Sequence, residues 1–309
     1  MKKIFAIIAA LVLAGGAAFA QDLSAATDTF NSALTAFQEG NKTAALDGFN
    51  KALTIAKALG EEGASIVNDC QATLPKVALS IAKDLIKAAD FDAAVTKLQD
   101  AQKLAEEYKI DDVIAEAKTL VPQVLMQKAN ALLKTDPAAA AAAYQQIVDA
   151  DPTNGTAALR LGAALNTAGK LDEAVKAFEL AAANGQEATA KKQLSNLFLK
   201  QASNALKEKK YADAIADALK CNEYAANPQA LQIAGQASQL AGKNADAITY
   251  FTQYLEASPD AKNAGQIAYT VGALYQQAKN NAKAKEFYQK ATSDPKYGAE
   301  AKKLLDALK

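Results

Sequence analysis

The sequence predicts an all-α protein built as a row of about seven stacked helical hairpins. A segment from Gly155 to Ala181 has the pattern of two short helices folded back on each other, and this pattern recurs along the chain. Aromatic residues make up only 6% of the 309 residues and there is no Trp, while Ala, Leu, Lys, Gln, Asp and Glu dominate. Such a composition favours helices and supplies few β-branched runs for a sheet.

The hairpin at residues 155–181 shows the repeating unit most clearly. Its first helix has Leu161 and Gly162 on one face, and its second has Phe178 and small residues on one face. Gly169 can take the positive φ that ends the first helix. Small residues permit close approach of the backbones, and large ones fill the remaining space. Because one hairpin cannot cover its own apolar face, it needs neighbours.

Seven segments share the pattern of the second helix: a small residue, then a mostly large residue four positions on, then a third apolar position. The small residues, here called the marker alanines, are Ala45, Ala94, Ala140, Ala174, Ala214, Ala247 and Ala284. The residues four positions on are Phe49, Leu98, Tyr144, Phe178, Ala218, Phe251 and Tyr288. The residues three positions further are Ala52, Ala101, Ile147, Ala181, Cys221, Tyr254 and Ala291.

This pattern, with Leu-Gly in the first helix, Gly-x-x-x-x-Ala across the turn and an aromatic residue four positions on, resembles the tetratricopeptide repeat, or TPR. The resemblance covers nearly all of the chain after residue 20, with prolines near the family's closing position at Pro152, Pro259 and Pro295. It implies a right-handed superhelical solenoid. We expect residues 298–309 to form a C-terminal capping helix, which such arrays need for solubility.

Residues 1–20 have the features of a secretory signal peptide: two lysines at the start, an apolar core over residues 4–13, and small residues at positions 18 and 20. A membrane anchor is the alternative, but the apolar run is short for a span. The residue after the expected cut is Gln21, not Cys, so a bacterial lipoprotein anchor is not indicated. We expect export, to the bacterial periplasm or beyond, without stable membrane insertion of the mature chain.

The mature chain divides into two parts by repeat spacing. In residues 21–152 the marker alanines are 49 and 46 positions apart, against about 34 in the family. The extra residues precede Pro75 and Pro122, and they form either an extension of the next helix, bent at the proline, or a short separate helix. We favour the long bent helix. Residues 153–297 have spacings nearer the family's period, with a loop expected at Asn184-Gly185.

Composition removes several function classes. The chain has 34 basic and 34 acidic residues, so no basic field attracts nucleic acid. It has no His, the commonest general base and zinc ligand, and no Gly-rich phosphate loop or ligand cluster. We therefore expect no catalytic residues, no metal and no cofactor. Cys70 and Cys221 are far apart in sequence, so we expect two buried thiols and no disulfide between them.

The resemblance implies where a partner would bind. In TPR arrays the first helix of each pair lines a concave groove with its positions 2, 5, 9 and 12, which form one face because of their 3, 4, 3 spacing. In the last two repeats these positions are mostly amides, which both donate and accept hydrogen bonds. The predicted partner-binding set, here called the amide stripe, is Gln229, Gln232, Gln236, Gln239, Gln266, Tyr269 and Gln276, with Ala273 between the last two.

The sequence favours a non-catalytic interaction scaffold of the cell envelope that binds a protein or extended peptide in this groove. Alternatively, the glutamines are helix formers that simply face water. TPR domains that hold a C-terminal carboxylate use Lys, Asn and Arg on this face, whereas here Leu159, Ala163 and Leu199 stand at matching positions. A glycan- or peptidoglycan-binding protein is the alternative function, weakened because the few aromatic residues fall mostly at core positions.

Overall fold

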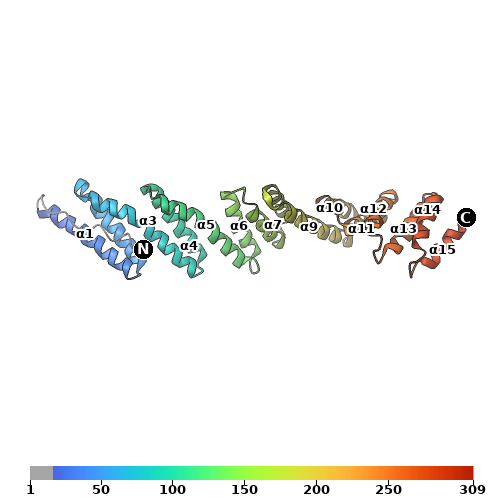
Figure 1. The fold of residues 1–309 in the computed structure, drawn as a ribbon, viewed down its shortest axis with the longest axis horizontal. Coiled ribbons are helices and arrows are strands. Elements are labelled where there is room, and N and C mark those ends of the chain that lie inside the picture. Colours follow the sequence, from blue (N-terminus) through green and yellow to red (C-terminus); the bar gives the residue numbers. More distant parts are fainter. Residues whose placement is uncertain (1–16, 309) are drawn as a thin grey trace. The chain divides into compact units, whose positions relative to one another are not determined.

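The computed structural model describes residues 17–308, and side chains from Asp22 onward. All regular structure in this part of the chain is helical (Figure 1). Residues 1–16 of the predicted signal peptide lie outside the described residues. The elements up to residue 150 are α1 (Ala17–Gln38), α2 (Lys42–Ala58), η1 (Gly60–Gly63), α3 (Ala64–Lys87), α4 (Phe91–Tyr108), α5 (Asp111–Leu132) and α6 (Pro137–Ala150). The later elements are α7 (Gly155–Thr167), α8 (Leu171–Ala181), η2 (Ala182–Gln186), α9 (Glu187–Lys207), α10 (Tyr211–Tyr224), α11 (Pro228–Leu240), α12 (Asn244–Ala257), α13 (Ala264–Gln277), α14 (Asn281–Ala291) and α15 (Gly298–Ala307).

The described residues form two compact units, one up to Ile147 and one from Val148 onward. Within the first unit α1 to α4 each pack against the next helix in sequence, and within the second α7 to α14 do the same (Figure 1). Packing in sequence order is what an array of hairpins requires, and the all-α repeat architecture predicted from the sequence is confirmed. The predicted boundary at residue 152 and the handedness of the superhelix stay predictions.

The register of the marker alanines is confirmed in every repeat. All seven marker alanines are 0% exposed, and the residues four and seven positions on are at most 6% exposed. The seven hairpins of the described chain are therefore α1–α2, α3–α4, α5–α6, α7–α8, α9–α10, α11–α12 and α13–α14, with α15 after them. Within the first unit, apolar clusters run from the first hairpin into the second and from the second into α5. Within the second unit, they run from α11–α12 into α13–α14 and from there into α15, so these hairpins cover apolar faces of their neighbours.

Close packing within three hairpins depends on a glycine that faces an aromatic ring. A Cβ built on Gly162 would lie 2.6 Å from the Phe178 ring, and one on Gly272 would lie 2.7 Å from the Tyr288 ring. The same arrangement brings the α11 backbone against Phe251 at Gly235. The ring of the second helix therefore occupies the volume that a side chain on the first helix would need.

The turns inside the hairpins are also uniform. Gly169 has φ +79°, as expected from the sequence, and the residue five positions before the marker alanine has positive φ in six of the seven described hairpins. Three of these residues are not glycine: Ala89, Lys209 and Lys279, with φ near +60°. In each turn the amide of the next residue bonds the carbonyl five positions back, as for Lys170 N to Leu165 O at 2.9 Å.

The two long spacings are explained by long first helices. Pro75 lies inside α3, which has 24 residues, and Pro122 lies inside α5, which has 22. Residues 64–74 and 111–121 therefore extend α3 and α5 at their N-termini, while residues 60–63 form the separate short helix η1. The bend expected at the two prolines stays a prediction. The predicted loop at Asn184-Gly185 interrupts helical geometry, with φ +83° at Gly185.

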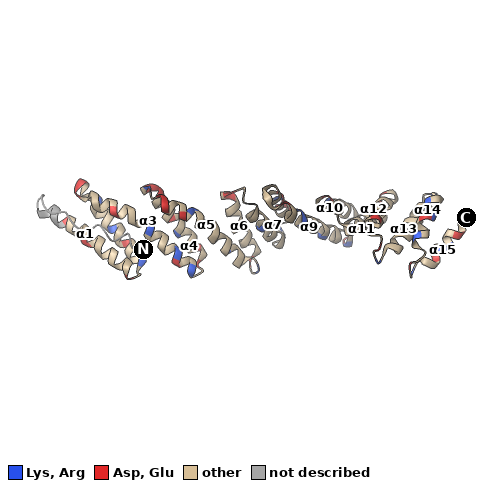
Figure 2. Cartoon of the chain, in the orientation of Figure 1, with Lys and Arg blue, Asp and Glu red and all other residues tan. Residues whose placement is uncertain are grey.

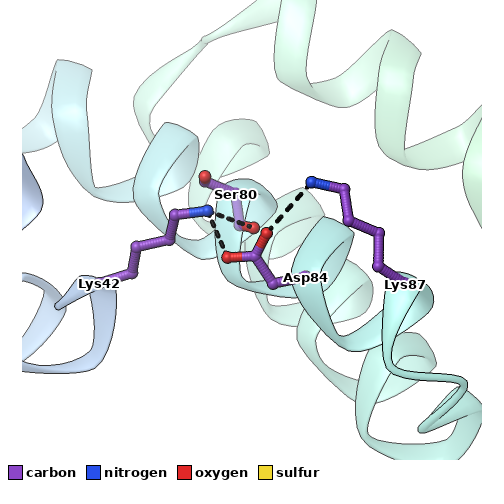
Figure 3. Close-up of polar contacts among 4 residues, drawn as sticks. All are labelled: Lys42, Ser80, Asp84 and Lys87. Carbon is purple, nitrogen blue, oxygen red and sulfur yellow. Dashed lines mark hydrogen bonds and ion pairs between the residues drawn. The ribbon is translucent and has the colours of Figure 1, made fainter. Parts of the chain in front are cut away.

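Ion pairs link successive hairpins in the first unit. The Lys42 ammonium on α2 bonds the Asp84 carboxylate on α3 and the Ser80 carbonyl, 3.4 Å away, while Lys87 lies 3.5 Å from Asp84 (Figure 3). Lys83 pairs with Glu116 of α5 at 2.6 Å, and a lysine of α5 pairs with an aspartate of α4. In the described part of the second unit, lysine–carboxylate pairs are local in sequence instead.

We expect Asp84→Asn to lower the stability of the first unit in a pH-dependent way. The hydrogen bond and charge of Lys42 hold the pKa of Asp84 below its ordinary value of 3.8, so the stabilisation is present above that pH and disappears as the pH falls through the lowered value. Because both side chains are partly exposed, the loss at neutral pH should be only about 0.2–1 kcal/mol. Urea titrations of both proteins at neutral pH and near pH 2 measure it, and an equal difference at both pH values would contradict this assignment.

No helix among residues 17–308 is both long enough and apolar enough to cross a membrane. Both cysteines are buried and free, as expected. Burial, and next the neighbouring Asp69, raise the pKa of Cys70 to about 12, so this thiol stays protonated. The Cys221 sulfur lies 3.2 Å from the Ser195 hydroxyl, inside the α9–α10 hairpin.

Candidate partner-binding face

The α11 part of the amide stripe lies on the outward face of its helix. Gln229 and Gln239 are exposed and Gln232 and Gln236 are half-buried, whereas the residues opposite, such as Ala234, are buried. None of the four side-chain amides bonds another described residue. Since a glutamine amide carries two donors and an acceptor with two lone pairs, α11 presents a face of unused hydrogen-bonding groups.

The α13 part of the stripe is engaged in the fold itself. The Tyr288 hydroxyl of α14 donates to Gln276 Oε1 at 2.7 Å, so this amide braces its own hairpin. Burial, and next the nearby Tyr269, raise the pKa of Tyr288, which keeps the phenol protonated as a donor. Of the stripe residues on α13, only Gln266 is exposed with a side chain that bonds no other described residue.

The Tyr269 ring is held by aromatic neighbours and not by the glutamines. It stacks on Tyr297, with 5.1 Å between ring centroids and 24° between planes, and it lies 5.7 Å from Tyr288 at 50°. Tyr297 belongs to the turn that leads into α15. The sequence prediction placed Tyr269 at the centre of the stripe, whereas in the structure its contacts join the last hairpin to the C-terminal helix.

A hollow of about 390 Å³ opens beside Gln266, and this hollow was not predicted from the sequence. Two turns and the start of α13 line this open hollow. Its lining consists of Lys262, Asn263, Gln266, Asp294, Pro295, Lys296 and Tyr297. A signal was present in the sequence, because Asp-Pro-Lys-Tyr-Gly is a turn rich in polar and aromatic groups, but its contact with the start of α13 could not be deduced from helical periodicity.

The walls of this hollow are fixed by bonds from the fold. Tyr254 donates its hydroxyl to Asn263 Oδ1 at 2.5 Å. Asp294 Oδ1 accepts the amides of Lys296 and Tyr297 at 2.9 and 2.8 Å. The turn also approaches α13 closely, since a Cβ on Gly265 would lie 2.6 Å from the Asp294 side chain. The hollow is therefore formed before any ligand arrives.

The charges of the described chain show no field of one sign. Lysines and carboxylates are interspersed along the helices (Figure 2). Within residues 17–308 no group of three or more Cys, Asp or Glu side chains has the arrangement of a metal site. The stripe on α11 is uncharged, so it can recognise a partner by hydrogen bonds and shape, while the hollow adds two ammonium groups and one carboxylate.

Comparison with known families agrees with this architecture. Residues 127–189, from the last turns of α5 to the start of α9, match the tetratricopeptide repeat family model. This segment is therefore similar to tetratricopeptide repeats. It includes the hairpin α7–α8, where Gly162 faces Phe178 and Gly169 makes the turn.

Several solved structures are similar to this chain. The protein titled MamA AMB-1 is 21% identical over 56% of this chain and 91% of its own length, with a TM-score of 0.35. YrrB, described as a TPR protein with an unusual peptide-binding site, is 23% identical over 58% of this chain and 91% of its own, with a TM-score of 0.33. Pseudomonas aeruginosa pilF is 16% identical over 62% and 83%, with a TM-score of 0.30. No curated protein matches the chain.

Proposed function

We propose that this protein is a non-catalytic interaction scaffold of the cell envelope, and that it binds a protein or extended peptide on the outward face of α11 and the start of α13. The observation that carries the proposal is the face of α11. Its glutamines have unused amides on one side of a helix whose other side is buried in the array. An extended peptide backbone offers the alternating donors and acceptors that such amides can pair with.

Export is part of the proposal and follows from the residues at the start of the sequence. A basic start, a short apolar core and small residues before Gln21 are the features that a signal peptidase recognises. Mass spectrometry of the protein isolated from envelope fractions of its own organism should find an N-terminus at Gln21. A cytoplasmic protein that retains residues 1–20 would overturn the assignment to the envelope.

The binding face is tested by crosslinking and then by affinity. A photoreactive residue placed at Gln236 should capture a partner in envelope preparations, and one at the exposed Gln253 of α12 should not. For the purified partner, Gln232→Ala together with Gln236→Ala should weaken binding at least about tenfold, or about 1.4 kcal/mol. Neither amide bonds another described residue, so the fold should be unchanged.

A matched control uses glutamines on second helices. Gln253 of α12 and Gln289 of α14 are exposed, and replacing both with alanine removes the same chemistry from outside the stripe. This variant should bind the partner as the wild type does. Equal losses in both variants, or no loss in either, would exclude the α11 face as the binding surface. Binding of soluble wall fragments in place of any protein would instead favour the glycan alternative.

A further inference from the structure

The hollow beside α13 is lined by more basic than acidic residues. Two lysines, Lys262 and Lys296, are among the residues that line it, with a single acidic residue, Asp294. Neither lysine pairs with a carboxylate of the described chain, although nearby lysines do. Lys283 and Lys290 both pair with Glu286, at 2.9 and 3.2 Å.

The one carboxylate of the hollow already has structural partners. Asp294 Oδ1 accepts two backbone amides of its own turn, and the side chain packs against the backbone of α13 at Gly265. It is thereby committed to holding the turn and the start of α13 together. The Lys296 ammonium lies over the Tyr297 ring, 5.1 Å from its centroid, and both residues line the hollow.

The hollow shares one residue, Gln266, with the proposed binding face. Its volume of about 390 Å³ lies in the range of sites that accept small ligands or side chains. Its walls are preorganised by the bonds of Tyr254 and Asp294, so binding costs little ordering of the protein. A segment lying along α13 would therefore pass this hollow with one of its side chains directed into it.

We propose that the hollow receives an aspartate or glutamate side chain from the bound segment, so that the partner is an extended acidic peptide. The inference rests on the proposed function and specifies its ligand. The carboxylate would replace water around the Lys262 and Lys296 ammonium groups, with the Gln266 amide as an additional donor. Charge complementarity of this kind sets specificity and association rate more than total affinity.

The test compares two dye-labelled synthetic peptides of equal length, one with glutamate at alternate positions and one with glutamine there. Fluorescence anisotropy with the full mature chain should show the glutamate peptide binding about tenfold more tightly than the glutamine peptide. Lys262→Glu with Lys296→Glu should abolish this preference. Added salt should weaken the glutamate peptide's binding more than that of the glutamine peptide.

The control variant carries the same change of net charge elsewhere. Lys192 of α9 and Lys302 of α15 are exposed and form no ion pair with described carboxylates, and Lys192→Glu with Lys302→Glu should leave the preference unchanged. An equal effect of both double variants would overturn the inference, because the peptide would then respond only to total charge. No binding of either peptide would overturn it as well.

The outcomes for the hollow and for the scaffold can be told apart. If both peptides bind alike and Gln232→Ala with Gln236→Ala weakens both, the α11 face binds peptides and the acidic preference is wrong. If the partner captured at Gln236 loses no affinity when Lys262 and Lys296 are reversed, the scaffold function stands and the hollow has no part in it.

Discussion

Replacing Gly162 with alanine will destabilise the α7–α8 hairpin, although alanine is the better helix former. A Cβ at this position would lie 2.6 Å from the Phe178 ring, which is 0% exposed and cannot move aside. Overpacking of this kind costs about 1–3 kcal/mol, against a gain of about 1 kcal/mol in helix propensity. Native-state hydrogen exchange of the α7 and α8 amides measures the change locally.

Another hairpin of the chain indicates which second substitution should relieve this overpacking. In the α3–α4 hairpin the equivalent positions are Ala82 and Leu98, both 0% exposed, so alanine is accommodated where the facing residue is leucine. In a Phe178→Leu background, Gly162→Ala should therefore become neutral or stabilising. A double-mutant cycle gives the coupling between the two positions. If Gly162→Ala destabilised both backgrounds equally, the ring would not be the cause.

The first hairpin achieves the same close approach with the small residue on the other helix. Ala33 occupies the position equivalent to Gly162, and a Cβ on Gly48 of α2 would lie 2.7 Å from the Ala33 Cβ. A small residue faces a large one across several hairpins, but a buried register does not require this pair. The α9–α10 hairpin has alanine at both positions, Ala202 and Ala218, and both are buried.

Most of the fold could be predicted because it depends on local periodicity. Seven marker alanines placed all seven hairpins of the described chain, since a helix buries the same face at every repeat. The structure around Pro75 and Pro122 was harder to predict, because a proline is tolerated both at a helix start and at a bend. Only packing against α2 and α4 decides that residues 64–87 form one helix.

The candidate site was predictable in part, and the reason lies in which residues come from one helix. The α11 glutamines follow from helical spacing alone. The contacts of Tyr269 with Tyr297, and of Gly265 with Asp294, join α13 to a turn about thirty positions away, and no periodicity encodes them. Likewise, Gln276 is equivalent to the other glutamines in the sequence pattern. In the structure, its hydrogen bond with Tyr288 gives it a role inside the α13–α14 hairpin.

Glycine at the three turn positions that lack it will stabilise the protein. Ala89, Lys209 and Lys279 have φ of 58°, 61° and 59°, a left-handed conformation that costs about 1–2 kcal/mol for a residue with a Cβ. Part of this gain is offset because glycine loses more conformational freedom on folding. We expect each substitution by glycine to raise the free energy of unfolding of its unit by about 1 kcal/mol, measured by urea titration or hydrogen exchange.

The reverse substitutions and a side-chain control test whether backbone conformation causes the gain in stability. Gly40, Gly169 and Gly242 stand at the equivalent turns, and a Cβ on any of them would meet nothing within 4 Å. Alanine there should cost about 1 kcal/mol through backbone conformation alone. Lys209→Ala and Lys279→Ala should be near neutral, because they remove the ammonium group and keep the Cβ. If these alanine variants were as stable as the glycine variants, loss of the lysine side chain would explain the gain. The backbone strain attributed to the turns without glycine would then be wrong.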